Sequence, residues 1–166
     1  MKKKWFLPLG ILAVLVLAAL IYTRPMPLEA LCEADITQCQ SVFGNHFRAP
    51  QAEDTRFAFP ADDARCAQLT ALFAQQKFRR SLANLLPQGG TTHRTQDGDF
   101  RWEVGFRFDE TDFPDGSTGK GVFVQCRNFC GKLSLFRAYD GKSFRCTVQD
   151  QDAFLQQVYG IISSEP

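Results

Sequence analysis

The sequence predicts an α+β fold: an N-terminal transmembrane helix, then a long helix packed on a five-stranded antiparallel meander, with a short C-terminal helix. Three observations predict it. Residues 5–22 carry no charge, residues 62–86 repeat apolar side chains at helical spacing, and residues 100–108 alternate apolar and polar side chains with a period of two. A sheet with one apolar face needs a covering layer, which the long helix can supply.

The N-terminal apolar segment has the features of a membrane anchor. Residues 1–4 form a basic n-region, and the next 18 residues would rise about 27 Å as a helix, close to the hydrocarbon thickness of a bilayer. Lysines on the short side predict a bacterial inner-membrane protein that spans once, with its N-terminus in the cytoplasm and its domain in the periplasm. A cleaved signal peptide that releases the domain to the periplasm is the alternative.

The rest of the chain divides into a lead-in and a domain. Residues 23–60 contain four prolines and little periodicity, which predicts a stalk and irregular lead-in before an extracytoplasmic domain over 61–166. Asp62 or Asp63 caps the long helix and Asp150 caps the closing helix. The predicted strands are residues 91–96, 100–108, 121–127, 132–139 and 143–149. Cystatin-like and NTF2-like curved sheets share this layout, an analogy of architecture that implies no function.

Six cysteines follow the apolar segment, and an even number in an exported chain predicts disulfides. We expect the pairs Cys32–Cys39, Cys66–Cys146 and Cys126–Cys130, out of about 15 possible connectivities. Zinc sites usually combine two closely spaced ligand pairs, whereas only Cys126 and Cys130 have such spacing here. The C-x-x-C spacing of redox enzymes is absent. The sequence therefore predicts no metal site and no cofactor.

Other candidate sites fit their motifs poorly. Residues 109–116 hold four carboxylates, but their spacing differs from that of an EF-hand calcium loop. Residues 116–121 lack the first glycine and the final Ser or Thr of a phosphate-binding loop. His46 and His93 are the only histidines, and no catalytic motif surrounds either of them.

The predicted strands also point side chains away from the covering helix. Alternation places basic side chains there that could form a stripe for an acidic partner. Phe123, Phe129 and Phe136 fall outside the main inward alternation, and large exposed apolar patches mark interaction sites. The candidate partner-binding residues are Phe123, Phe129, Phe136, Arg127 and Arg137, and the stripe adds Arg101, Glu103, Arg107 and Arg145.

Charge and motifs together favour a binding role. Without the three N-terminal lysines, 16 basic residues face 18 acidic residues, which argues against nucleic acid as a partner. We expect a membrane-tethered, disulfide-stabilised, non-catalytic protein that binds another envelope protein as an assembly subunit, sensor partner, inhibitor or immunity protein. One alternative is a carrier or sensor of a small apolar ligand held between helix and sheet. Another is a small extracytoplasmic hydrolase that uses His46 or His93.

Overall fold

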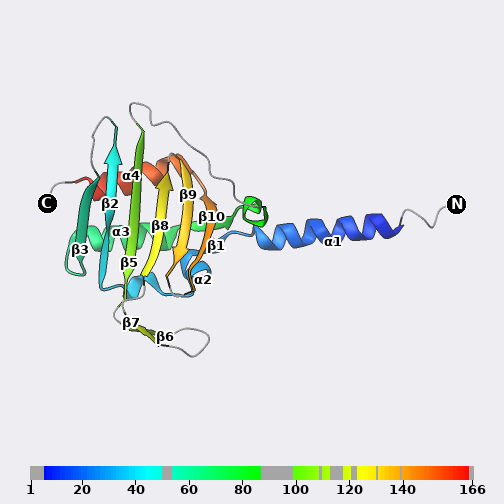
Figure 1. Cartoon of the computed structure of the whole chain (residues 1–166), viewed down its shortest axis with the longest axis horizontal. Helices are drawn as coiled ribbons and strands as arrows, with labels where there is room; N and C mark the ends of the chain where they lie inside the picture. Colours follow the sequence, from blue (N-terminus) through cyan, green and yellow to red (C-terminus); the bar gives the residue numbers. More distant parts are fainter. Residues whose placement is uncertain are drawn as a thin grey trace.

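The computed structural model describes residues 6–49, 54–86, 99–108, 110–112, 118–120, 123–129, 131–138 and 140–164. Within them the chain forms an α+β fold with one large antiparallel sheet, two helices behind it and a further helix, α1, that projects from one side (Figure 1). The helices are α1 (Phe6–Tyr22), α2 (Leu28–Cys32), α3 (Ala64–Gln75) and α4 (Gln151–Ile162), with short 3-10 helices η2 (Ile36–Gln38) and η3 (Leu82–Leu85).

The large sheet has eight described strands in the order β1-β4-β10-β9-β8-β5-β2-β3, and every neighbouring pair is antiparallel. Its strands are β1 (Met26–Pro27), β2 (Ser41–Arg48), β3 (Thr55–Pro60), β4 (Lys77–Arg80), β5 (Phe100–Arg107), β8 (Phe123–Phe129), β9 (Lys132–Arg137) and β10 (Lys142–Val148). A separate two-stranded sheet pairs β6 (Glu110–Asp112) with β7 (Thr118–Lys120).

The core lies between this sheet and helices α3 and α4. The α3 helix begins at Asp63, whose carboxylate accepts a hydrogen bond from the backbone N–H of Arg65. Its buried Phe73 packs edge-on against Phe106 of β5 and Phe154 of α4, with ring centroids 5.1 Å apart in both pairs. Burying each such ring contributes roughly 1.5–3 kcal/mol, so these aromatic contacts fix the helices on one face of the sheet.

The five-stranded meander is wrong, because the sheet has eight strands. The predicted strands at 100–108, 121–127, 132–139 and 143–149 correspond to β5, β8, β9 and β10, while residues 91–96 lie outside the described residues. The segment 23–60, predicted to be irregular, supplies β1, β2 and β3. The long predicted helix ends at Gln75, after which β4 pairs with β10.

The predicted transmembrane anchor over 5–22 is also wrong. Across the residues that the structure describes, no helix is long and apolar enough to cross a membrane. The single-pass inner-membrane location inferred from that segment is therefore corrected as well.

The predicted disulfides are not supported, because no two sulfurs of the described cysteines lie at bonding distance. Burial raises the pKa of Cys39 to about 11, and the neighbouring thiol of Cys66 adds to the shift. The expected partner of Cys39 was Cys32, not Cys66. Burial also raises the pKa of Cys126, and the thiols of Cys146 and Cys32 add to it. Cys39 and Cys66 therefore form one group of neighbouring thiols, and Cys32, Cys126 and Cys146 form another. The two members of each expected pair, Cys32–Cys39 and Cys66–Cys146, lie in different groups. The third expected pair includes Cys130, which lies outside the described residues.

Candidate functional site

The candidate site is the open face of the sheet, which points away from α3 and α4. In Figure 1 these two helices lie behind the sheet, and the strands face the viewer. Along each strand the buried side chains alternate with more exposed ones, as expected when only one face is covered. The open face carries Phe43 and Phe47 of β2, Arg101 and Arg107 of β5, Arg127 and Phe129 of β8, and Phe136 of β9.

Arginine and phenylalanine side chains stack on one another across this face. The guanidinium carbon of Arg101 lies 4.5 Å from the ring centroid of Phe47. That of Arg107 lies 4.8 Å from the Phe43 ring. A third pair, Arg127 and Phe136, has a separation of 5.9 Å. Each exposed contact of this kind contributes about 0.5–1 kcal/mol, and it holds a flexible arginine over a phenylalanine ring.

A glycine makes room for one of these stacks. Gly105 of β5 lies opposite Phe43, and a Cβ atom at this position would lie 2.7 Å from Cζ of the Phe43 ring. Because Gly105 has no side chain, the Phe43 ring can lie over β5, where Arg107 stacks on it. Aromatic rings packed over a strand glycine also shield the exposed backbone there.

The open face is strongly basic. Among the described strand residues at open-face positions, one acidic residue, Glu103, stands among eight basic ones, which are Arg56, Lys77, Arg79, Arg101, Arg107, Arg127, Lys132 and Arg145. Glu103 pairs with Arg127, with 3.0 Å between Oε2 and Nε. Arg101 pairs with Asp54 at 2.9 Å. These exposed pairs leave a large excess of positive charge on one face of a chain whose net charge is only +1.

The structure brings together three of the five predicted partner-binding residues. Arg127, Phe129 and Phe136 share the open face, and Phe129 is 46% exposed. Phe123 pairs with Arg107 at the start of β8, and nothing further is described for its side chain.

Arg137 lies elsewhere, on the covered face, where only 6% of the residue is exposed. Its guanidinium donates to the backbone oxygen of Leu31 at 3.2 Å and pairs with Glu33 at 3.0 Å. It also pairs with Asp140 at 2.6 Å. These contacts join β9 to α2, so Arg137 stabilises the fold and does not reach a partner on the open face.

Sequence reasoning missed Phe43 and Phe47 because residues 23–60 were predicted to be irregular. The sequence signal in this strand is weak, because the inward positions are Val42, Gly44 and His46 and only the first is a typical core residue of a strand.

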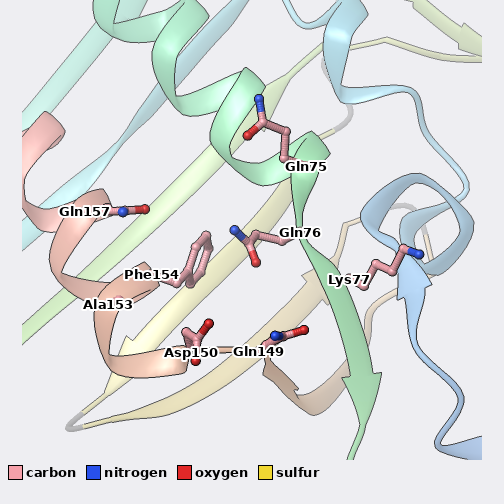
Figure 2. Close-up of a pocket in the computed structure, with 8 residues that line it drawn as sticks. All are labelled: Gln75, Gln76, Lys77, Gln149, Asp150, Ala153, Phe154 and Gln157. Carbon is pink, nitrogen blue, oxygen red and sulfur yellow. The ribbon is translucent and has the colours of Figure 1, made fainter.

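His46, one of the two histidines considered for a hydrolase, is buried in the fold. His46 is 8% exposed, and its ring packs edge-on against Tyr159 with centroids 5.5 Å apart. Burial lowers the pKa of His46, and the carboxylate of Asp54 opposes this shift. His46 lines neither the cavity of Figure 2 nor the other cavity described below. The second histidine, His93, lies outside the described residues.

A cavity of about 490 Å³ lies between the end of α3 and the start of α4. Figure 2 shows the side chains of Gln76 and Gln157 on either side of the Phe154 ring, while those of Gln75 and Lys77 point away from it. Amide groups both donate and accept hydrogen bonds, and the lining adds one cation, Lys77, and one carboxylate, Asp150, so it carries no net charge with which to select a ligand. We assign no site to this cavity.

The described interior gives little support to an apolar-ligand carrier. The indole of Trp102 is 1% exposed, donates a hydrogen bond to the backbone oxygen of Leu155 at 3.2 Å, and packs against Phe73 and Phe154. These rings fill the space between sheet and helices in which such a ligand would sit.

Comparison of the chain with protein-family models, with curated proteins and with solved structures gave no match. Among the described residues, no group of three or more His, Cys, Asp or Glu side chains could hold a metal ion. The case for a function therefore depends on the surface chemistry of this chain.

Proposed function

We propose that this protein is a non-catalytic binding module that docks an acidic protein partner on the open face of its sheet. The observation that carries the proposal is the set of three arginine–phenylalanine stacks on neighbouring strands. A partner that presents carboxylates between apolar side chains would complement both components of this surface.

The stacking explains why carboxylates suit this surface. A guanidinium that lies flat on an aromatic ring keeps its N–H groups in the ring-parallel plane, where a carboxylate can accept two of them. Arg127 makes such a two-pronged contact within the chain, because its Nε and Nη2 atoms contact the two carboxylate oxygens of Glu103 at 3.0 and 3.2 Å. A carboxylate of a partner can bind Arg107 in the same way.

The same stacks favour protein over nucleic acid. Single-stranded nucleic acid is held by bases that stack on free aromatic faces. Here one face of each of three phenylalanine rings is occupied by a guanidinium of the chain itself. Nucleic-acid-binding domains are also usually basic as a whole, whereas this chain has an isoelectric point of about 7.6.

The test compares two double variants with the same loss of charge. The probe is a fluorescein-labelled peptide in which glutamates alternate with leucine and phenylalanine, measured by fluorescence anisotropy. We expect Arg107→Gln/Arg127→Gln to weaken binding about tenfold, while Arg24→Gln/Arg48→Gln, which removes two cations from outside the open face, leaves it within about twofold. Binding to the unmodified protein should fall as salt is added.

Three results would contradict the proposal. The first is no saturable binding of the peptide to the unmodified protein, and the second is equal weakening by both double variants. The third is tighter binding of a single-stranded oligonucleotide than of the peptide at the same ionic strength. The last result would assign the surface to nucleic acid. Circular dichroism of both variants shows whether the sheet is intact.

A further inference from the structure

A second candidate site lies on the covered side of the sheet, at the edge where α1 ends beside β4 and β10. A cavity of about 420 Å³ opens there. It is lined by three cationic residues, one carboxylate residue, two aromatic residues and two neutral polar ones, which are Arg80, Arg137, Lys142, Glu33, Tyr22, Phe144, Asn84 and Ser143. Cavities of roughly 300–1,000 Å³ are the usual size of small-molecule sites.

Arg80 is the central residue of this cavity. It is the last residue of β4, aligned with Cys146 of β10, and it is partly buried. Its guanidinium carbon lies 5.7 Å from the centroid of the Tyr22 ring and 5.5 Å from that of Phe144. These rings stabilise the cation but accept none of its in-plane N–H hydrogen bonds. Among the residues that the structure describes, no carboxylate pairs with Arg80.

The other cations of the cavity already have carboxylate partners. Arg137 pairs with Glu33 at 3.0 Å and with Asp140 at 2.6 Å. Lys142 pairs with the same Asp140 oxygen at 3.1 Å. Three cations therefore face two carboxylates in and beside the cavity, and the uncompensated positive charge belongs to Arg80.

The cavity wall beside Arg80 is fixed in place. The side-chain amide of Asn84 donates to the backbone oxygen of Arg145 at 2.9 Å and accepts from its N–H at 2.7 Å, which ties η3 to β10. The Asn84 amide is thus committed to structure and is not available to a ligand. A pre-formed site loses less entropy when it binds a ligand.

We propose that this cavity binds a small organic anion through its oxyanion head group, a carboxylate or a phosphate monoester. Arg80 supplies the bidentate N–H fork. The rings of Tyr22 and Phe144 contact the ligand body beside the head group, so an aromatic anion binds more tightly than a simple one. This site is separate from the open face, and neither proposal depends on the other.

The test is a titration of the full chain, labelled with ¹⁵N, at constant ionic strength. The four probes are acetate, benzoate, inorganic phosphate and phenyl phosphate, which separate the type of head group from the contribution of the ring. The readout is the Nε–Hε resonance of Arg80, which reports binding in the unmodified protein without any substitution. We expect saturable shifts, with the aromatic member of the better-bound pair at least about threefold tighter.

The matched substitutions are at neighbouring residues of β4. Arg80→Gln should weaken binding at least about tenfold, Arg80→Lys should weaken it less, and Arg79→Gln should leave it unchanged because Arg79 lies on the other face of the strand. The proposal is overturned if none of the four probes saturates by about 10 mM, a concentration at which even weak sites fill. It is also overturned if Arg79→Gln and Arg80→Gln weaken binding equally.

Discussion

The substitution Gly44→Ala tests most directly how closely β2 and β5, two strands of the open face, approach each other. Gly44 lies in β2, where a Cβ atom would be 1.8 Å from the backbone oxygen of Glu103 and 2.8 Å from its carbonyl carbon. Real Cβ atoms essentially never approach another heavy atom closer than 3.0 Å, so the two strands must separate by about 1.2 Å. The contacted atoms are backbone, and no side-chain rotation can relieve the clash.

The expected loss follows from what that separation breaks. Overpacking alone destabilises a protein by about 1–3 kcal/mol, and each ladder hydrogen bond lost between β2 and β5 adds roughly 1 kcal/mol. We therefore expect Gly44→Ala to lower the free energy of unfolding by roughly 4 kcal/mol, a large share of the 5–15 kcal/mol typical of a domain.

Urea unfolding followed by circular dichroism measures this loss. Gly160→Ala is the matched control, because Gly160 lies within α4 and a Cβ atom there would meet nothing within 4 Å. That variant should gain about 0.5–1 kcal/mol from helix propensity. A Gly44→Ala protein within about 1 kcal/mol of the unmodified one, with an unchanged denaturant dependence, would refute the close approach of β2 and β5.

Three further outcomes follow from buried groups. Trp102→Phe removes the indole hydrogen bond to the Leu155 oxygen and part of the packed ring, and should lower the free energy of unfolding by about 2 kcal/mol in urea, whereas an unchanged midpoint would contradict that burial. Burial raises the pKa of Cys32 to about 12 and that of Cys39 to about 11. Iodoacetamide at pH 8 should therefore modify both far more slowly in the folded protein than in urea, with the half-buried Cys39 reacting first, as mass spectrometry of the labelled peptides would show. Burial lowers the pKa of His46, so the unfolded chain binds a proton that the folded chain excludes; stability should fall as pH drops below about 6.5, and less so in His46→Gln.

The sequence predicted those strands whose alternation is complete within the strand itself. Residues 100–107 alternate without interruption, and they form β5 in the middle of the sheet. In β2 the inward positions include Gly44 and His46, neither of which is a typical strand core residue, so the pattern is weak. Its pairing with β5 on one side and β3 on the other supplies the missing stability.

The end of the long helix shows how one pattern fits two structures. Phe78, Leu82 and Leu85 continue the helical spacing of Phe73, which predicted a helix as far as residue 86. Phe78 is instead buried as a strand residue of β4 against Val148, while Leu82 and Leu85 are exposed on η3. Apolar spacing alone could not separate these outcomes, because pairing with β10 is a long-range contact.

The candidate site was predicted in part, for a clear geometric reason. Period-two alternation places Arg101, Arg107 and Arg127 on the face opposite the apolar side chains, and the structure has them there. The same rule applied to β9 puts Arg137 on the face of Leu133 and Leu135, where it is buried. Which cysteine thiols lie near one another could not be predicted in this way, because Cys66 belongs to α3 and its position depends on how that helix packs on the sheet.

Both proposals depend on one property of arginine, and a charge-conserving substitution tests it. Arg107→Lys keeps the positive charge on the open face but removes the planar group that lies 4.8 Å from the Phe43 ring. If positive charge alone attracts the acidic peptide, this variant binds it as the unmodified protein does. We expect binding to weaken about threefold to tenfold, since the ammonium group neither stacks as well nor offers a two-pronged hydrogen bond to a carboxylate. Lys132→Arg, which places a guanidinium on the same face at β9, is the control for a general preference for arginine. Equal affinities of the unmodified and Arg107→Lys proteins across a salt series would show that the stacks are structural and that the face recognises charge only.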